Sequence, residues 1–310
     1  MAAGARIGII GMGWVGSSVA ISTLSSGVAR ELLLHDARAE IAQAEAMDLS
    51  HGSSFYPPAA VRAVSLDEVL TSDAVVISAG RASKGAQSRL ELARDNAALM
   101  RELARRFAGY RGIVVMVSNP VDVLTWVFQR ASGLPPERVL GTGTLLDTAR
   151  LRQILGREIG VDARSIHAQV VGEHGDSEVV LWSSASVGGA PLRDWPGWDR
   201  AREGVIAEAV RTAAYEIIRR KGATNHAIGL VAAALLRWTL RGERRVVTVS
   251  RVQPAGAGLG DVALSLPCLV GAHGATSVLR AAMDAGEKRQ LERSAELLRG
   301  TLEGVATLAA

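Results

Sequence analysis

The sequence predicts an α/β protein in which a Rossmann-type, doubly wound parallel sheet is followed by a mixed α+β domain. Short apolar runs alternate with amphipathic stretches through the first half of the 310 residues. A glycine-rich segment, Gly11 to Gly16, follows the first of these runs and opens the first helical stretch. The pattern changes after about Gly143. We therefore expect two closely packed domains, residues 1–143 and residues 144–310.

Six strands are predicted for the first domain, each of them a short apolar run between polar or glycine residues: Ala5–Ile10, Glu31–His35, Val61–Val64, Ala74–Ser78, Ile113–Val117 and Arg138–Leu140. Helices are predicted between them, notably Val15–Ser26, Ala39–Asp48 and Leu90–Phe107. Parallel strands need such crossover connections, because the chain must return to the same end of the sheet. A six-stranded doubly wound sheet is the expected result.

The second domain mixes helices with strands. A helix over Leu146–Ile159 precedes two apolar segments that flank His174 as a strand pair. Further helices are predicted over Asp199–Lys221, Thr224–Arg241 and Asp284–Leu302, with Gly222 breaking or kinking the chain between the first two. Strands over Val246–Ser250 and Val262–Leu266 are joined through a glycine-rich turn at residues 256–260.

Composition and charge exclude several classes of protein. Hydrophobic residues make up 48% and charged residues 21% of the chain, which is typical of a soluble globular protein. The net charge of +4 comes almost entirely from arginines interspersed with acidic residues, so we expect no nucleic-acid partner. No apolar run reaches membrane-spanning length, and no targeting segment precedes the first strand. With Cys268 as the single cysteine, a cytoplasmic protein is expected.

The glycine-rich segment has the spacing of a dinucleotide-binding turn. Gly11 allows the tight turn, Gly13 lets a pyrophosphate approach the backbone, and Gly16 lets helix and strand pack closely. Asp36 ends the second predicted strand, where a carboxylate can accept hydrogen bonds from a ribose and repels a 2′-phosphate. This pattern favours NAD over NADP. The alternative is a glycine turn without a ligand.

The most chemically suggestive side chain is His174, which lies between glycines on a predicted loop. An imidazole there can exchange a proton near neutral pH. Asp147 and Arg150 share one helix face, so Asp147 could orient the ring and Arg150 could bind a carboxylate. The alternatives are a structural histidine and an ordinary surface ion pair, and the spacing alone favours that surface pair.

Two predicted loops should face the same crevice as the glycine turn, because both follow strands of the parallel sheet. Residues 80–89 have the composition of a mobile, basic loop that could close over a substrate. Asn119 follows the fifth strand and precedes Pro120, so the peptide bond between them can be cis. The alternatives are a solvated basic loop and a simple turn.

Together these motifs resemble the L-lactate/L-malate dehydrogenase family nearly from end to end, and its bacterial NAD-dependent L-lactate enzymes most. The matching motifs stand in the family's order: Gly11–Gly16, Glu45–Leu49, Ser88–Leu92, Ser118–Asp122, Leu146–Arg150, Gly172–Asp176 and Lys221–Thr224. The resemblance implies direct hydride transfer between C2 of a 2-hydroxy acid and C4 of the nicotinamide of NAD. The different-class alternative is a non-catalytic NAD-binding protein that has kept the fold.

The resemblance also implies roles for single residues. His174 matches the proton donor and acceptor, and Asp147 matches its carboxylate partner. Arg150 matches the arginine that binds the substrate carboxylate, and Arg89 matches the loop arginine that polarises the reacting carbonyl. The implied substrate-binding residues are Ser83, Arg89, Asn119, Arg150 and Thr224, and the implied NAD-binding residues are Gly11, Gly13, Val15, Gly16, Asp36, Gly80, Val117, Asn119 and Thr142.

The choice of substrate depends on Ser83, which occupies the position that contacts the substrate side chain. Malate enzymes usually have arginine there and lactate enzymes glutamine. Serine lacks the charge that a second carboxylate needs, and it leaves room for side chains larger than methyl. We therefore expect pyruvate and lactate first, bulkier 2-hydroxy acids second and malate third.

The resemblance extends to assembly and regulation. The family forms dimers and tetramers, so a homotetramer is expected. Arg152 and His167 match positions at which allosteric bacterial lactate dehydrogenases bind fructose 1,6-bisphosphate, and an arginine with a histidine suits a phosphate. Activation by this ligand is a hypothesis, because non-allosteric members can keep similar residues.

Overall fold

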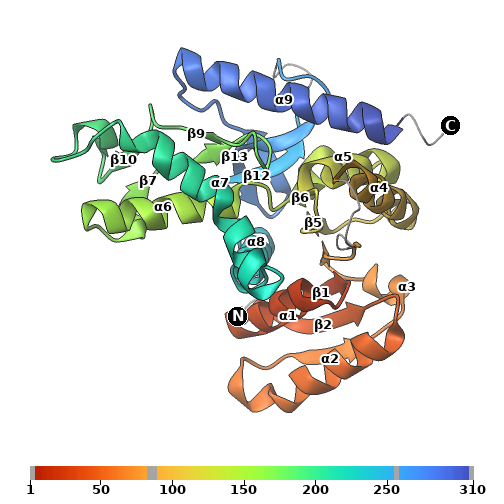
Figure 1. The fold of residues 1–310 in the computed structure, drawn as a ribbon. Coiled ribbons are helices and arrows are strands. Elements are labelled where there is room, and N and C mark those ends of the chain that lie inside the picture. Colours follow the sequence, from red (N-terminus) through yellow and green to blue (C-terminus); the bar gives the residue numbers. More distant parts are fainter. Residues whose placement is uncertain (1–3, 82–88, 255–257, 307–310) are drawn as a thin grey trace.

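One nine-stranded sheet runs through the molecule in the order β14-β13-β12-β6-β5-β4-β1-β2-β3. The computed structural model describes residues 4–81, 89–254 and 258–306. Parallel strands β1 to β6 confirm the predicted doubly wound arrangement (Figure 1). Their bounds are Ala5–Ile10, Ala29–His35, Ala60–Ala63, Ala74–Ile77, Ile113–Met116 and Val139–Gly141.

The prediction that this sheet stops at six strands is wrong. Three antiparallel strands extend it beyond β6: β12 (Arg245–Val252), β13 (Ala263–Gly271) and β14 (Gly274–Val278). The join is close, because a Cβ atom at Gly141 of β6 would lie 2.9 Å from the Cβ of its partner Ser250. The β12–β13 pair confirms the predicted hairpin, whose turn includes residues 255–257, which lie outside the described residues.

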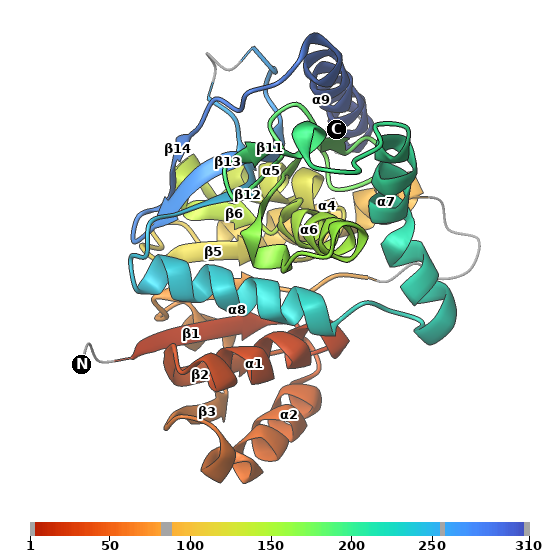
Figure 2. The same ribbon diagram turned by 90° about the vertical axis from the view of Figure 1, so that its left-hand side faces the viewer.

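Helices cover both faces of the sheet. One face carries α1 (Trp14–Ser26), α2 (Ala39–His51) and α8 (His226–Leu240), and the other carries α4 (Arg89–Arg105), α5 (Val121–Ser132) and α9 (Ala285–Ala306). Figure 2 shows α8 lying along α1. A Cβ at Gly229 of α8 would be 2.6 Å from the Ser18 carbonyl oxygen, so this glycine permits the close approach.

The loop that carries His174 lies between two short strands. Strands β8 (Val170–Val171) and β9 (Val179–Val180) form the predicted pair on either side of it. Helix α7 (Arg202–Lys221) ends where Gly222 adopts φ +85°, which confirms the predicted break. The other elements are α3 (Leu66–Val69), α6 (Leu145–Ile159), α7 (Arg202–Lys221), β7 (Ile166–His167), β10 (Ser186–Val187), β11 (Ala190–Pro191) and short 3-10 turns at Ser53–Phe55, Pro136–Arg138, Ala163–Ser165 and Leu192–Asp194.

Two large apolar clusters lie on the two faces of the sheet, and a third lies beneath α6 and α7. The sheet places the carboxyl ends of β1, β4, β5 and β6 at one edge, towards α6 and the β8–β9 loop. Among the described helices, none combines the length and the hydropathy of a membrane span.

Candidate active site

The imidazole of His174 is held by the carboxylate of Asp147. Nδ1 of His174 lies 2.6 Å from Oδ2 of Asp147, which comes from the first turn of α6. Asp147 is 1% exposed, and an ionised carboxylate can only accept hydrogen bonds. Nδ1 must therefore carry the proton that it donates. The ring keeps 27% of its side-chain surface exposed, so its second nitrogen, Nε2, remains available to a ligand.

Arg150 shares the same carboxylate. Its Nη1 donates to Oδ1 of Asp147 at 2.6 Å, so the two oxygens of Asp147 serve two different partners. The Arg150 side chain is 15% exposed and the Asp147 side chain 2% exposed. The interpretation of these two residues as an ordinary surface ion pair is therefore wrong. Helical spacing showed that they share a face, but not that this face is buried against the His174 loop.

Electrostatics favour the charged forms of this group. Burial of the His174 ring acts to lower its pKa, but the charge and hydrogen bond of Asp147 outweigh burial and raise the pKa to about 9. The carboxylates of Asp122 and Glu178 add to the rise. For Asp147, burial acts to raise the pKa, but His174 and Arg150 lower it below its usual value. A protonated imidazole beside an ionised carboxylate is therefore the stable state at neutral pH.

The backbone of the His174 loop is fixed from two sides. The N–H of His174 donates to Oδ2 of Asp122, on α5, at 2.7 Å. The N–H of the preceding Glu173 donates to Oγ of Ser294, on α9, at 2.9 Å. Gly172 adopts φ +88°, and a Cβ there would lie 2.8 Å from the same Ser294 oxygen. These contacts join α5 and α9 at one short loop.

The glycine-rich turn has the shape that a pyrophosphate requires. A Cβ at Gly11 would lie 2.5 Å from the Ala79 nitrogen, and one at Gly16 would lie 1.9 Å from the Gly11 carbonyl oxygen. At Gly13, apart from adjacent residues of the chain, no heavy atom of the described residues comes within 4 Å of a Cβ position. Two glycines thus permit tight packing, while the third leaves the helix N-terminus open to a ligand.

Asp36 lies directly beside this turn. Its carboxylate accepts hydrogen bonds from the Met12 N–H at 2.8 Å and from the Arg38 N–H at 2.9 Å. Each carboxylate oxygen has a further lone pair that can accept a ribose hydroxyl. These residues fit the adenosine and pyrophosphate parts of NAD.

The other predicted cofactor residues lie at the carboxyl edge of the sheet. Val117 and Thr142 are buried just after β5 and β6, where their N–H groups donate to the carbonyls of Ile77 and Met116 at 2.9 and 3.0 Å. Gly80 follows β4 and packs near the Asn96 amide. Val15 is half-buried in the first turn of α1.

Of the other predicted substrate residues, Asn119 and Thr224 are fully described, whereas Arg89 and Ser83 are not. The Asn119–Pro120 peptide is cis, and Oδ1 of Asn119 accepts from the Val121 N–H at 3.2 Å. Thr224 is half-buried between α7 and α8. The backbone of Arg89 begins α4, whereas Ser83 lies outside the described residues.

Arg152 and His167, both among the described residues, form no hydrogen bond with His174, Asp147 or Arg150. Arg152 is half-buried on α6, where its Nε donates to the Ala168 carbonyl at 2.9 Å. Burial lowers the pKa of its guanidinium. His167 is exposed on β7.

Three residues of the site were missed from the sequence. Asp122 is the last residue of the Ser118–Asp122 motif, in which only Asn119 was assigned a role, so the sequence did contain a signal for it. Glu178 follows His174 by four residues, and burial together with the charge of Asp147 raises its pKa to about 8. Ser294 had no signal, because an isolated serine in an amphipathic helix is unremarkable. Within the described ranges, no group of three or more His, Cys, Asp or Glu side chains is arranged to hold a metal ion.

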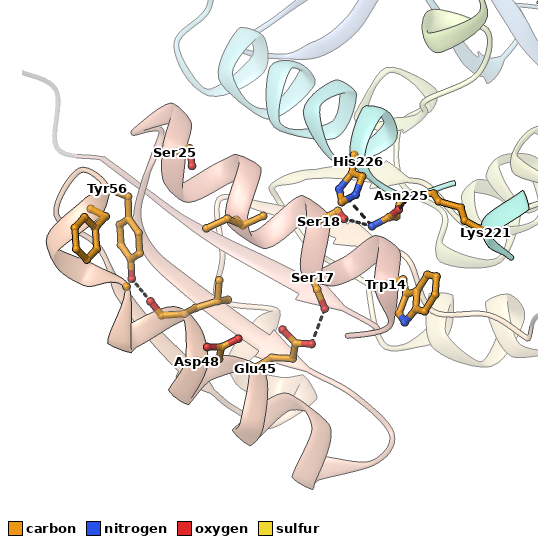
Figure 3. A pocket seen from close by; sticks show the side chains of 14 residues that line it. Trp14, Ser17, Ser18, Ser25, Glu45, Asp48, Tyr56, Lys221, Asn225 and His226 are labelled. Atoms are coloured by element: carbon orange, nitrogen blue, oxygen red, sulfur yellow. Dashed lines mark hydrogen bonds between the residues drawn. The ribbon is translucent and has the colours of Figure 1, made fainter. Parts of the chain in front are cut away.

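A separate cleft of about 700 Å³ lies between α1, α2 and the α7–α8 junction (Figure 3). Ser17 donates to Glu45 across it at 2.7 Å, and Asn225 donates to Ser18 at 2.9 Å. Trp14 lines it and is 64% exposed. The cleft does not include the His174 group.

Comparison with known proteins agrees with this geometry. Residues 5–141 match the model of the lactate/malate dehydrogenase NAD-binding domain, and residues 144–308 match that of the family's α/β C-terminal domain. An L-lactate dehydrogenase of Thermus aquaticus is 43% identical, with 95% of this chain and 97% of the relative covered. One of Kosmotoga olearia is 42% identical, with 97% and 96% covered.

Solved structures give the same result. The minor L-lactate dehydrogenase of Enterococcus mundtii, in a ligands-bound form, superposes with a TM-score of 0.94 at 35% identity, covering 97% of this chain and 98% of that one. A lactate dehydrogenase from a deep-sea metagenome library has a TM-score of 0.93 at 34% identity, with 98% and 99% covered. The chain belongs to the lactate/malate dehydrogenase family of NAD-dependent oxidoreductases.

Proposed function

We propose that the protein is an L-lactate dehydrogenase that interconverts pyruvate and L-lactate with NAD. The observation that carries this proposal is the buried Asp147 carboxylate, which contacts both the His174 imidazole and the Arg150 guanidinium at 2.6 Å. A proton donor and a carboxylate-binding cation are thus held side by side. The relatives named above are L-lactate dehydrogenases, which supports the same activity.

Each residue has a defined task in the proposed reduction of pyruvate. NAD in its reduced form supplies the hydride that reaches C2. Arg150 binds the pyruvate carboxylate with its planar fork, which orients C2 and the carbonyl oxygen. Protonated His174 donates to that oxygen from Nε2, while Asp147 stabilises the imidazolium before transfer. In lactate oxidation the neutral ring accepts the hydroxyl proton. The resemblance assigns Arg89 to polarise the carbonyl.

The proposed order of substrate preference depends on the residue at position 83. Serine carries no charge to pair with the second carboxylate of oxaloacetate, and it leaves space beside a methyl group. Pyruvate is therefore the proposed substrate, ahead of branched 2-oxo acids, with oxaloacetate last. A non-catalytic NAD-binding protein is the second candidate. The group formed by His174, Asp147 and Arg150 is complete, which favours an active enzyme over this alternative.

The test is NADH oxidation by the purified protein with pyruvate, oxaloacetate and 2-oxoisovalerate. We expect the highest kcat/KM with pyruvate. An Arg substitution at the specificity position, S83R, should raise the kcat/KM for oxaloacetate relative to that for pyruvate. Higher kcat/KM for oxaloacetate in the unchanged protein would overturn the substrate order. NADH binding without turnover of any of the three acids would favour the non-catalytic alternative.

A homotetramer is part of the proposal. Large exposed apolar side chains favour burial against another subunit. Trp14 and Phe55, which line the cleft between α1 and α2, are 64% and 92% exposed, and Met47 on α2 is 62% exposed. Light scattering after size exclusion should give four times the 32.5 kDa chain mass. F55D should lower that mass, whereas the substitution of an exposed surface arginine, R164A, should not. A monomeric mass for the unchanged protein would contradict this part.

Activation by fructose 1,6-bisphosphate is also proposed, on the basis of Arg152 and His167. His167 is exposed, and Arg152 is near it but uses Nε on a backbone carbonyl, which leaves its other nitrogens for a phosphate. Added fructose 1,6-bisphosphate should lower the pyruvate KM, and H167A should remove this effect. Unchanged pyruvate saturation curves across pH would end the idea. A cytoplasmic location, consistent with the single buried Cys268, completes the proposal.

A further inference from the structure

The side chain of Asp122 contacts the backbone of His174. It lies in the first turn of α5 and is 2% exposed. Its Oδ2 accepts the His174 N–H at 2.7 Å, while its Oδ1 makes no hydrogen bond with any described residue. A buried carboxylate normally needs a cation or several donors, because desolvation of the charge is costly. Among the described residues, no arginine or lysine forms an ion pair with Asp122.

The compensating charge is His174 itself. Burial raises the pKa of Asp122 to about 6, and the nearby Ser250 hydroxyl, the His174 N–H and the His174 charge all oppose that rise. At neutral pH the carboxylate is therefore ionised. The same charge acts in return on the imidazole, where it helps to raise the pKa of His174. The two groups stabilise each other's charged forms.

We propose that Asp122 is a positioning residue, whose carboxylate fixes the His174 backbone and whose charge favours the protonated ring. The proposal rests on the proposed function, because it assumes that His174 transfers the proton. His174 then lies between two carboxylates with separate tasks. Asp147 binds the ring at Nδ1, whereas Asp122 binds the main chain of the same residue.

Other charged groups also act on the pKa of His174, and the experiment must distinguish their effect from that of Asp122. Asp147 and Arg150 approach from α6, and Glu178 lies on the same loop. Arg211 on α7 acts on Glu178, and Glu173 acts on Asp122. Glu178 provides the useful comparison. It is a buried carboxyl group whose charge acts on His174 once it ionises, above its raised pKa of about 8. Among the described residues, its side chain forms no hydrogen bond to the His174 backbone.

The experiment measures the protonation of His174 without turnover. Diethyl pyrocarbonate reacts with neutral imidazole and not with its protonated form. The modification rate of the His174 peptide, followed by mass spectrometry across pH, therefore gives the midpoint of its titration. D122N removes the charge but keeps an amide oxygen that can accept the backbone N–H. We expect its midpoint to move to lower pH by about one pH unit. D261N, which changes an exposed carboxylate paired with Arg130, is the control and should not move it.

A second readout separates the charge from the backbone bond. D122A removes both, so in addition to the moved midpoint its kcat for pyruvate at pH 6 should fall about tenfold or more below that of D122N. E178Q removes a charge near His174 but no bond to its backbone, so it should move the midpoint and lower the kcat at pH 6 less than D122A does. If D122N does not fold, D122S, which keeps a hydroxyl acceptor, takes its place.

An unchanged midpoint of the His174 titration in D122N or D122S would overturn the proposal, regardless of the substrate that the enzyme uses. Equal kcat values for D122A and D122N at pH 6 would overturn the claim that Asp122 fixes the His174 backbone. Absence of pyruvate turnover in the unchanged protein would instead count against the proposed function, while the modification midpoints would still report on the charge of Asp122.

Discussion

Nδ1 of His174 and Oδ2 of Asp147 lie 2.6 Å apart, in a place where the aspartate has almost no contact with solvent. A charge-assisted hydrogen bond of this kind is stronger than a neutral one, and it selects the ring tautomer that leaves Nε2 free.

Substitution D147N should lower pyruvate reduction at pH 7 by about 100-fold or more, because the imidazolium loses its charge partner and the tautomer is no longer selected. The pH above which kcat/KM falls should also move down. Steady-state kinetics from pH 5 to 10 would show both effects. D261N is the matched control, and a D147N protein with unchanged kinetics would remove Asp147 from the mechanism.

The activity should depend on pH through the raised pKa of His174. Pyruvate reduction needs the protonated ring, so its kcat/KM should hold at neutral pH and decline as pH rises through about 9. Lactate oxidation needs the neutral ring and should rise over the same range. Initial rates in both directions provide the check, and a decline of pyruvate reduction centred near pH 6.5 would show that Asp147 does not stabilise the imidazolium.

Stability should follow the same titration. The folded-state pKa of His174 lies above its ordinary value of 6.5, so protonated His174 contributes stability that is complete below pH 6.5. That contribution is lost as pH rises through about 9. Urea unfolding of the unchanged protein and of H174N should therefore differ most at low pH and converge at high pH. A difference that grows with pH would have the wrong sign.

The glycine turn offers a matched pair of substitutions. In G16A the new Cβ would lie 1.9 Å from the Gly11 carbonyl, which forces the backbone apart and should cost about 2 kcal/mol or more of unfolding free energy. In G13A, apart from adjacent residues of the chain, no described heavy atom lies within 4 Å of the Cβ, so stability should hold while NADH affinity falls. Urea unfolding and NADH fluorescence titration separate the two effects. Equal stability of the two variants would contradict the packing argument.

Arg150 should be sensitive even to lysine. Lysine keeps the charge but loses the planar fork that matches a carboxylate, and it would also change the contact with Asp147. R150K should raise the pyruvate KM about 10- to 100-fold with a smaller change in NADH affinity. R164K, on an exposed arginine, is the control. An unchanged KM would show that Arg150 does not bind the substrate carboxylate.

Local patterns in the sequence predicted the parallel half of the fold. Strands such as Ala5–Ile10 are short apolar runs, and the turn at Gly11 to Gly16 has a recognisable spacing. Helix α5 was predicted only as a crossover without bounds, because Val121–Ser132 is rich in β-branched and aromatic residues, which do not favour a helix locally. The continuation of the sheet through β12 was missed because strand pairing depends on contacts between residues over 100 positions apart.

In the site too, contacts within one segment were predictable from the sequence, and contacts between distant segments were not. Spacing placed Asp147 and Arg150 on one face, but only the fold shows that His174 lies against them. Asp122 and Ser294 reach the catalytic loop across 52 and 121 residues of chain, and no local pattern indicates such contacts. Chemistry confined to one segment can be predicted from sequence, whereas contacts between distant segments need the structure.

The central claim is that His174 transfers the proton, and one measurement tests it most directly. Single-turnover oxidation of bound NADH by pyruvate would be compared between the unchanged protein and H174N, with the NADH dissociation constant measured on the same samples. We predict that H174N slows the hydride step by about 100-fold or more and leaves the NADH dissociation constant within about threefold, since the ring does not form the nucleotide turn. Rapid single-turnover oxidation by H174N would contradict the assignment.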